Sequence, residues 1–200
     1  MIKTIIFDWG GVLIDNPAPR ITTYCADYLN VAEQQLKKIQ QELEQDFQKG
    51  LLPEDIYWEK ICAHLQVPQP ATPSLWKDAV RAAYVENKKV FTLVSTLKKN
   101  GYTIGFLSNT EPPAMQFFYE QHYEVFDVTV FSCAEGIRKP DKRIYQITLE
   151  RLATQPDETV FIDNRPDNTE GAKNIGMHTI VFKNAEQLKN ELLAFRVKID

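Results

Sequence analysis

The chain has 200 residues, of which 44% are hydrophobic and 25% are charged, and its formal net charge is -4. This length suits one domain, or one domain with a sizeable insertion, and the composition is ordinary for a soluble globular protein. The negative charge and the lack of a basic stripe argue against nucleic-acid binding. The sequence has no long apolar span and opens directly into a predicted strand, so we expect no signal peptide, no membrane segment and a cytoplasmic location.

Cysteine and histidine form no metal-binding pattern in this sequence. Cys25, Cys62 and Cys133 are scattered, and no two of them form a C-x-x-C pair. The three histidines are equally dispersed. We therefore interpret the cysteines as reduced thiols that pack like small hydrophobic side chains, and the histidines as structural or solvent-facing residues.

The beginning of the chain predicts a buried strand that ends in a carboxylate. An apolar run from Ile2 to Phe7 leads directly into Asp8, which Trp9 and two glycines follow. A buried carboxylate is costly unless a cation or hydrogen bonds compensate its charge. We therefore expect a partner for Asp8 at the end of this strand.

Residues 16–89 contain helical patterns and almost no strand signal. After a turn at 16–19, apolar stripes with helical spacing predict helices over about 20–29, 31–49, 53–65 and 74–85. A helical insertion of roughly seventy residues after a first strand is a candidate cap or lid. We therefore predict a cap domain at 16–89 and a core domain made of 1–15 and 90–200.

The second half of the chain alternates strands with helices. Strand candidates cover 102–107, 125–132, 159–162 and 179–182, and helix candidates cover 90–99, 112–121, 140–153, 168–175 and 185–195. This alternation predicts a Rossmann-like α/β fold, in which a mostly parallel sheet carries helices on both faces, plus the inserted all-helical cap. Such sheets bind ligands at the carboxyl ends of their strands.

Polar side chains stand at three predicted strand ends, namely Asp8, Ser108 and Asp163. Two carboxylates at adjacent strand ends repel each other, and a hard cation such as Mg²⁺ relieves that repulsion. Other groups suited to a phosphate oxygen are Asn109, Thr110 and the cation of Lys139. A carboxylate nucleophile with a cation and hydroxyl donors indicates phosphoryl transfer through an acyl phosphate.

Four short motifs, in order along nearly the whole chain, resemble those of the haloacid dehalogenase-like hydrolases with a helical cap. The motifs read F-D-W-G-G-V, F-L-S-N-T, R-K-P-D and V-F-I-D-N-R-P-D-N. Each is weak alone, but four in the right order around a helical insertion form a specific pattern. In detail they resemble the family's bacterial α-glucose-1-phosphate phosphatases and the phosphatase domain of soluble epoxide hydrolase.

The resemblance implies a catalytic role for three residues of this chain. Asp8 matches the family's nucleophile, Ser108 its phosphate-binding hydroxyl, and Lys139 its lysine position. Asn109, beside Ser108, is a further candidate for binding the phosphate.

The cofactor that the resemblance implies is Mg²⁺, bound by Asp8, the backbone carbonyl of Gly10 and Asp163. Asn164 stands where the family often has a second Asp, so we expect weaker Mg²⁺ binding than in relatives that have that carboxylate. Asn168 is expected to orient Asp163 or to cap the helix that begins there. Both asparagines are therefore assigned to the surroundings of the metal site.

Gly10 is the main departure from the family pattern. The first motif is usually D-x-D, and its second Asp is the general acid and base, whereas Gly10 retains only the backbone carbonyl. General acid–base help is typically worth ~10²–10⁴-fold in rate. The enzyme could therefore be slow, could use a leaving group that needs little protonation, or could recruit another acid.

We predict a Mg²⁺-dependent phosphatase that hydrolyses a small phosphomonoester, with a sugar phosphate as one candidate, through an aspartyl phosphate on Asp8. Its partner is then a small phosphorylated metabolite rather than a nucleic acid or a membrane, and its oligomeric state stays open. Two alternatives also stay open. One is a non-catalytic phosphate-binding or regulatory protein, because of Gly10. The other is a 2-haloacid dehalogenase, because those relatives also lack the second Asp.

Overall fold

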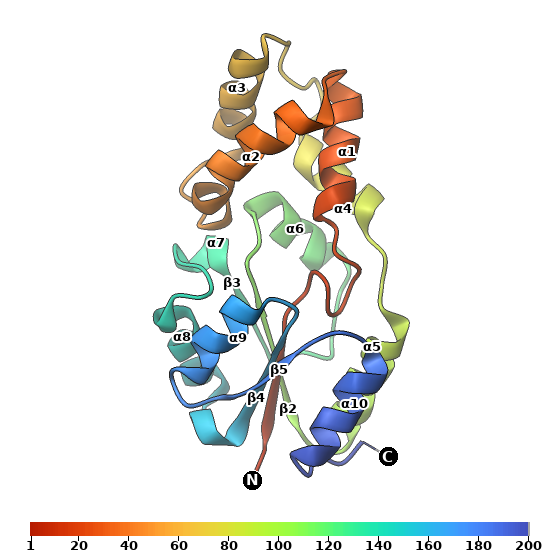
Figure 1. Ribbon diagram of the computed structural model, residues 1–200, viewed down its shortest axis with the longest axis vertical. Helices are drawn as coiled ribbons and strands as arrows, with labels where there is room; N and C mark the ends of the chain where they lie inside the picture. Colours follow the sequence, from red (N-terminus) through yellow and green to blue (C-terminus); the bar gives the residue numbers. More distant parts are fainter. Residues whose placement is uncertain (200) are drawn as a thin grey trace.

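Five short apolar strands pair in parallel, with β1 (Thr4–Phe7) at the centre of the sheet. The computed structural model describes residues 1–199. The strand order is β3-β2-β1-β4-β5, and every pair is parallel, which confirms the predicted α/β class (Figure 1). The remaining strands are β2 (Thr103–Ser108), β3 (Val128–Phe131), β4 (Thr159–Asp163) and β5 (His178–Val181).

Helices cover both faces of this sheet. Ile5 and Phe7 belong to the hydrophobic cluster on one face, whereas Ile6 between them belongs to the cluster on the other. This alternation follows from the two-residue period of a strand. The first face carries α5 (Lys88–Lys99), α6 (Pro112–Glu120) and α10 (Ala185–Ala194), and the second carries α8 (Lys142–Leu152) and α9 (Pro166–Lys173).

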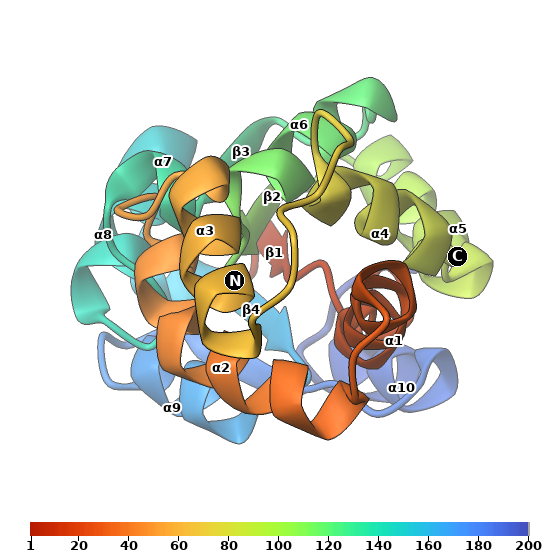
Figure 2. The same ribbon diagram turned by 90° about the horizontal axis from the view of Figure 1, so that it is seen from above.

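The segment 16–89 forms helices that gather beyond the carboxyl ends of the strands (Figures 1 and 2). They are α1 (Ala18–Leu29), α2 (Glu33–Gln48), α3 (Glu54–Leu65) and α4 (Leu75–Ala83). Helix α1 packs against α2 and α4, and α2 packs against α3. A cluster of aromatic rings fills the space between them, namely Phe47, Tyr57, Trp58 and Trp76. The four predicted helices are confirmed, and the division into a cap and a core domain stays a prediction.

The strand predicted over 125–132 is wrong at both ends. Before β3 begins, an Asp127 side-chain oxygen accepts the Ile104 N–H at 2.8 Å. That carboxylate replaces a backbone carbonyl of the strand ladder. After β3, the chain turns at once into the short helix α7 (Ser132–Glu135).

The helix predicted from Pro140 begins two residues later, at Lys142. The reason is its N-cap, because an Asp141 side-chain oxygen accepts the Arg143 N–H at 2.8 Å. Caps of this kind satisfy a backbone N–H that has no partner within the helix. Lys139 therefore lies in a loop before the helix and not in its first turn. A 3-10 helix, Pro156–Glu158, then leads into β4.

Contacts at two places join the helical segment to the rest of the chain. Helix α4 packs against α6, and Lys77 and Arg81 both pair with Glu120, at 3.1 and 2.9 Å. At the end of α2, the Ser132 hydroxyl donates to the Gln48 carbonyl at 2.5 Å. The helices therefore rest on the core at two sides of the strand ends.

The cysteines and histidines lie as the sequence predicts. The three cysteines are free, and Cys25 and Cys62 are buried. All three histidines are exposed to solvent. Within residues 1–199, no helix has the length and apolar character needed to cross a membrane.

Candidate active site

Asp8 directly follows the central strand, at the edge where the carboxyl ends of β2, β1 and β4 meet. Its N–H donates to the Ile162 carbonyl of β4 at 2.9 Å, so the sheet ladder holds its backbone. The chain then turns sharply, because the Trp9 carbonyl accepts the N–H groups of residues 12, 13 and 14 at 3.2, 2.9 and 3.1 Å. The Asp8 side chain is buried at this edge, with 6% of the residue exposed.

Lys139 is the partner that the buried carboxylate requires. Its Nζ lies 2.8 Å from Asp8 Oδ1 and 2.6 Å from Asp163 Oδ2, and it donates to the Leu107 carbonyl at 3.0 Å. The residue is 1% exposed. An ammonium group has three donors, and all three are directed at protein oxygens. The predicted contact of Lys139 with phosphate stays a prediction, and it requires one of these bonds to be exchanged.

The charges of this cluster shift the pKa values of its members. Burial, with the Asp163 charge added, raises the pKa of Asp8 to about 6, although Lys139 opposes the shift. Burial lowers the pKa of Lys139, but the charges of Asp163 and Asp8 outweigh it, so the net shift is upward. The lysine therefore stays protonated and neutralises part of the negative charge of the two carboxylates.

Neighbouring side chains hold the hydroxyl of Ser108 at the end of β2. Thr110 Oγ1 donates to Ser108 Oγ at 2.7 Å, and Ser132 Oγ accepts the Thr110 N–H at 2.8 Å. Because Ser108 Oγ already accepts a bond, its own proton is available for a ligand oxygen. Thr110, considered above as a second hydroxyl for phosphate, directs its proton at Ser108 in this structure.

Two asparagines orient the charged residues. Asn109 accepts the Lys139 N–H at 2.8 Å and donates to the Lys139 carbonyl at 3.0 Å. Asn168 Nδ2 donates to Asp163 Oδ2 at 2.9 Å, while the Arg165 N–H donates to Asp163 Oδ1 at 2.8 Å. Both polar ends of the Asn109 side chain are thus engaged by Lys139, which gives Asn109 a positioning role. Its contact with phosphate stays a prediction.

The two glycines after Trp9 have different structural requirements. Gly11 has φ +82°, and a Cβ there would lie 2.3 Å from the Asn164 amide nitrogen. Gly10 has no positive φ, and a Cβ there would meet only the Pro17 ring, at 3.2 Å from its Cδ. The backbone therefore requires glycine at position 11, whereas position 10 could hold a side chain after a small shift of the proline.

The oxygen atoms at this edge fit a hard cation such as Mg²⁺. Asp8 and Asp163 each direct a carboxylate oxygen at the same lysine nitrogen, and within residues 1–199 the Gly10 carbonyl accepts no hydrogen bond. Mg²⁺ prefers such oxygen ligands, and it keeps several waters of its own. The described part of the chain shows no group of three or more His, Cys, Asp or Glu side chains placed for a metal. That finding is compatible with a magnesium site that has only two carboxylates.

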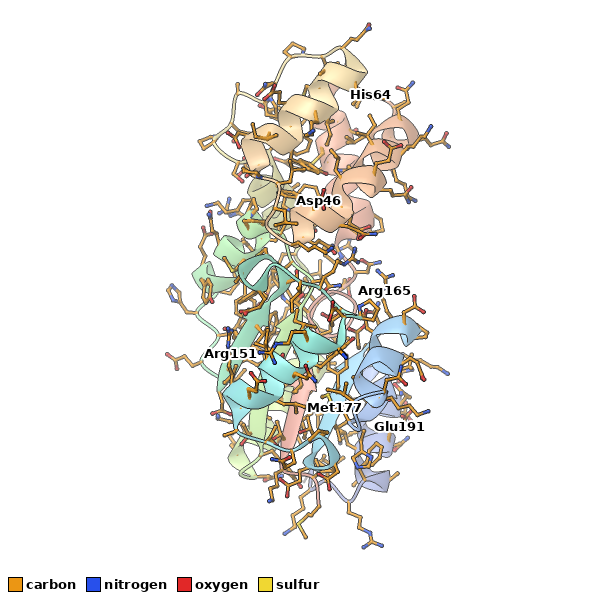
Figure 3. All side chains as sticks on the ribbon, turned by 90° about the vertical axis from the view of Figure 1, so that its left-hand side faces the viewer. Asp46, His64, Arg151, Arg165, Met177 and Glu191 are labelled. Atoms are coloured by element: carbon orange, nitrogen blue, oxygen red, sulfur yellow. The ribbon has the colours of Figure 1, made fainter. Side chains whose placement is uncertain are left out.

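A cavity of about 530 Å³ extends from this edge toward the helical segment, within the range of small-molecule sites. Its sheet side is lined by residues that the sequence singled out, namely Asp8, Gly10, Ser108, Asn109, Lys139, Asn164 and Asn168. Asp163 is fully buried and joins them through Lys139 and Asn168. Figure 3 shows Arg165, which also lines the cavity, at the level where the helical segment meets the core, and His64 far from it.

The opposite wall of the cavity was not predicted from the sequence. It includes Gln40, Glu44 and Gln48 of α2 and Trp76 of α4. Glu111, at the N-cap of the core helix α6, also lines the cavity and accepts the Gln48 amide at 3.0 Å. One signal was present, because Gln40 lies within the apolar stripe of α2 and is 8% exposed. A polar side chain on a buried helix face needs a partner or a ligand.

Fold and site together place a buried carboxylate, Asp8, directly after the central strand of a parallel α/β sheet. A family model of haloacid dehalogenase-like hydrolases matches residues 2–176. This match covers most of the chain, so the protein belongs to the haloacid dehalogenase-like hydrolase family. The resemblance read from the four motifs is thereby confirmed.

Several relatives of this chain are phosphatases. It is 26% identical to the sesquiterpene phosphatase astK of Aspergillus oryzae, over 88% of this chain and 87% of that protein. It is 24% identical to the D-ribitol-5-phosphate phosphatase of Bacteroides thetaiotaomicron, over 96% of this chain and 97% of that protein. Other relatives are longer, and the chain spans 19% of acyl-CoA dehydrogenase family member 10 and 21% of bifunctional epoxide hydrolase 2, both of Mus musculus.

A solved structure shares the fold. It is a haloacid dehalogenase family enzyme of Bacteroides thetaiotaomicron in complex with magnesium and inorganic phosphate. The TM-score is 0.73, with 23% identity over 92% of this chain and 96% of that chain. At this identity the likeness concerns the fold alone.

Proposed function

We propose that this protein is a Mg²⁺-dependent phosphatase that hydrolyses a small phosphomonoester through an aspartyl phosphate on Asp8. One observation carries the proposal: Asp8 and Asp163 share the buried Lys139 at the edge of a cavity into which Ser108 can donate a proton. Family membership and the phosphatases among the relatives support it. Asp8, the Gly10 carbonyl and Asp163 would hold the metal, which would neutralise charge on the phosphoryl group when bound.

The proposed reaction has two steps. First, a carboxylate oxygen of Asp8 bonds to phosphorus while the bond from phosphorus to the leaving-group oxygen breaks, and that oxygen takes up a proton from a water molecule. Water then attacks the phosphorus, which releases inorganic phosphate and restores the Asp8 carboxylate. Lys139 reduces the negative charge that an approaching phosphate meets, and Ser108 donates to a phosphoryl oxygen.

The helical segment 16–89 would act as a cap over this chemistry. It forms the wall opposite Asp8, and its helices lie beyond the strand ends (Figure 2). A closed cap excludes bulk water and selects the leaving group. Because Gly10 supplies no acid, leaving groups that need little protonation would react fastest.

Phosphate release from a panel of phosphosugars and p-nitrophenyl phosphate, with Mg²⁺ and with a chelator, tests this function. We expect metal-dependent release that the Asp8→Asn substitution lowers by about a thousandfold or more, as for the loss of other enzyme nucleophiles. Asp15→Asn is the matched control, because Asp15 is an exposed carboxylate next to the same turn, paired with Arg20 at 3.5 Å. No release with Mg²⁺, or equal release by the Asp8→Asn variant, would overturn the proposal.

Two further assays on the same protein distinguish the alternative functions, a 2-haloacid dehalogenase and a non-catalytic phosphate-binding protein. Halide release from a 2-haloacid, without phosphate release, would identify a dehalogenase. Calorimetric binding of a sugar phosphate without turnover would identify a phosphate-binding or regulatory protein. Turnover that depends on Asp8 excludes this second alternative.

A further inference from the structure

We propose that Ser132 is a positioning residue, which couples the docking of the helical segment 16–89 on the core to the phosphate-binding hydroxyl of Ser108. The inference rests on the proposed function and adds a residue that acts on the site through its neighbours. It starts from a continuous series of hydrogen bonds that runs from the end of α2 to Ser108. The core members of this series, Ser108, Thr110 and Ser132, are all buried, and Ser132 is 0% exposed.

The series begins at the carboxyl end of α2, which packs against α7. The last carbonyls of a helix have no partner within the helix, and Gln48 is the last residue of α2. Its carbonyl accepts the Ser132 hydroxyl at 2.5 Å, while its side-chain Nε2 donates to Glu111 Oε1 at 3.0 Å. Because Glu111 follows Thr110 in the sequence, both bonds connect the end of α2 to the surroundings of Thr110.

Ser132 also contacts both polar groups of the Thr110 backbone. Its Oγ accepts the Thr110 N–H at 2.8 Å and lies 3.4 Å from the Thr110 carbonyl oxygen, which is a second acceptor for the serine proton. A serine hydroxyl has only one proton, and the shorter distance assigns it to Gln48 while α2 is docked. If α2 moves away, the proton is left to the Thr110 carbonyl, so the hydrogen bonding of the Thr110 backbone changes.

Thr110 transmits this change to Ser108. Its Oγ1 donates to Ser108 Oγ at 2.7 Å, and Ser108 lines the cavity. A hydroxyl that accepts a bond keeps its own proton for another partner, which for Ser108 is a ligand oxygen in the cavity. Hydrogen bonds weaken steeply when their angles are distorted. A small shift of Thr110 is therefore enough to turn the Ser108 proton away from a phosphoryl oxygen.

Phosphate binding and the docking of α2 should consequently stabilise each other, because coupling between two binding events is reciprocal. A docked α2 orients the Ser108 hydroxyl for phosphate. Phosphate bound to Ser108 in turn favours the arrangement of Thr110 and Ser132 in which α2 is docked. The site would then hold phosphate most tightly when the helical segment covers it.

The test measures the affinity for inorganic phosphate in the presence of Mg²⁺ by isothermal titration calorimetry, which does not require turnover. Ser132→Ala removes the hydroxyl and should weaken phosphate binding by about fivefold, the effect of one hydrogen bond. In a Ser108→Ala background it should change the affinity by less than about twofold, because a residue that acts through Ser108 has no further effect once that hydroxyl is absent. Ser132→Cys, which keeps a weaker hydrogen-bonding group, supplies the same comparison if Ser132→Ala does not fold.

Thr110 provides the rescue experiment, and Thr148 the matched control. Thr110→Val removes the hydroxyl that donates to Ser108 and should weaken phosphate binding, whereas Thr110→Ser keeps that hydroxyl and should bind within about twofold of the unchanged protein. Thr148 is also fully buried, and its hydroxyl donates to the Ile144 carbonyl at 2.8 Å within α8. Thr148→Val should therefore lower Tm and leave the phosphate affinity unchanged.

Hydrogen exchange tests the coupling from the side of α2. Phosphate should slow amide exchange at the end of α2 in the unchanged protein, and this protection should be lost in Ser132→Ala. Equal protection in both proteins, or an equal loss of affinity on Ser132→Ala with and without the Ser108 hydroxyl, would overturn the positioning role while leaving the phosphatase intact. If the unchanged protein neither binds phosphate nor hydrolyses p-nitrophenyl phosphate, the proposed function fails, and this inference with it.

Discussion

At the scale of single residues, Gly10 leaves the site without a side chain that could act as general acid and base. The backbone does not require glycine there, because the position has no positive φ and a Cβ would meet only the Pro17 ring at 3.2 Å. A carboxylate at this position would supply the missing acid and base. We expect Gly10→Asp to raise kcat for p-nitrophenyl phosphate by about tenfold or more, measured by steady-state kinetics with saturating Mg²⁺.

Gly11→Asp is the control for this gain. Its Cβ would lie 2.3 Å from the Asn164 amide at a φ of +82°, so it should lose both stability and activity. A rate for Gly10→Asp equal to or below that of the unchanged protein would show that the missing side chain does not limit turnover.

Glu111 gives a second prediction at this scale, on stability against pH. Burial first, and the Glu44 charge in addition, raise the pKa of Glu111 above 4.5, while Gln48 and Trp76 oppose the shift. The folded protein then binds this proton at pH values where the unfolded chain has lost it, so stability falls as pH rises from about 4.5 through the raised pKa. Glu111→Gln cannot ionise, and its unfolding free energy in urea should decrease less than that of the unchanged protein between about pH 4 and pH 8. An equal or larger decrease would contradict this account.

At the scale of elements, the strand ends were predictable and the helical wall was not. Asp8, Ser108 and Asp163 each follow an apolar run, and parallel pairing necessarily brings the carboxyl ends of β1, β2 and β4 to one edge. Gln40 and Trp76 lie on helices whose mutual packing depends on contacts between distant segments, which a helical pattern does not specify. The positioning role of Asn109 depends on a loop more than twenty residues away in sequence, and for the same reason it was not visible.

Helix α9 gives a prediction at this scale, because it approaches the Lys139 loop closely at Gly171. A Cβ there would lie 2.9 Å from the Pro140 carbonyl oxygen and 2.9 Å from the Tyr145 hydroxyl. Gly171→Ala should therefore displace the loop that holds Lys139 and lower the free energy of unfolding by about 1–3 kcal/mol, as measured by urea denaturation. Lys173→Ala, an exposed substitution on the same helix, should change it by less than about 0.5 kcal/mol. Equal stabilities of the two variants would refute the close packing.

At the scale of the whole molecule, the cavity is bounded both by the helical segment and by the core. Gly50 lies at the end of α2, where a Cβ would be 2.3 Å from the Cys133 carbonyl oxygen. Gly50→Ala should move the helical segment away from the core, lower Tm and raise KM for phosphate esters. Thermal denaturation and steady-state kinetics measure the two effects.

Gly101→Ala is the matched control for Gly50→Ala. Gly101 also has a positive φ, +86°, but a Cβ there would meet nothing within 4 Å. Both variants carry the backbone strain of an alanine at positive φ, and only Gly50→Ala carries the clash. KM should therefore rise only in Gly50→Ala. If KM rises equally in both variants, the close contact at Gly50 does not affect substrate binding, and the prediction is wrong.

The central claim is that Asp8 becomes phosphorylated during turnover, and one chemical measurement tests it most directly. Borohydride reduces an acyl phosphate to an alcohol, so quenching the protein during hydrolysis of p-nitrophenyl phosphate with Mg²⁺ converts a phosphorylated aspartate into homoserine. Mass spectrometry of the digested protein should find homoserine at position 8, and only when substrate is present. Phosphate release without modification of Asp8, or with modification of a different carboxylate, would contradict the account.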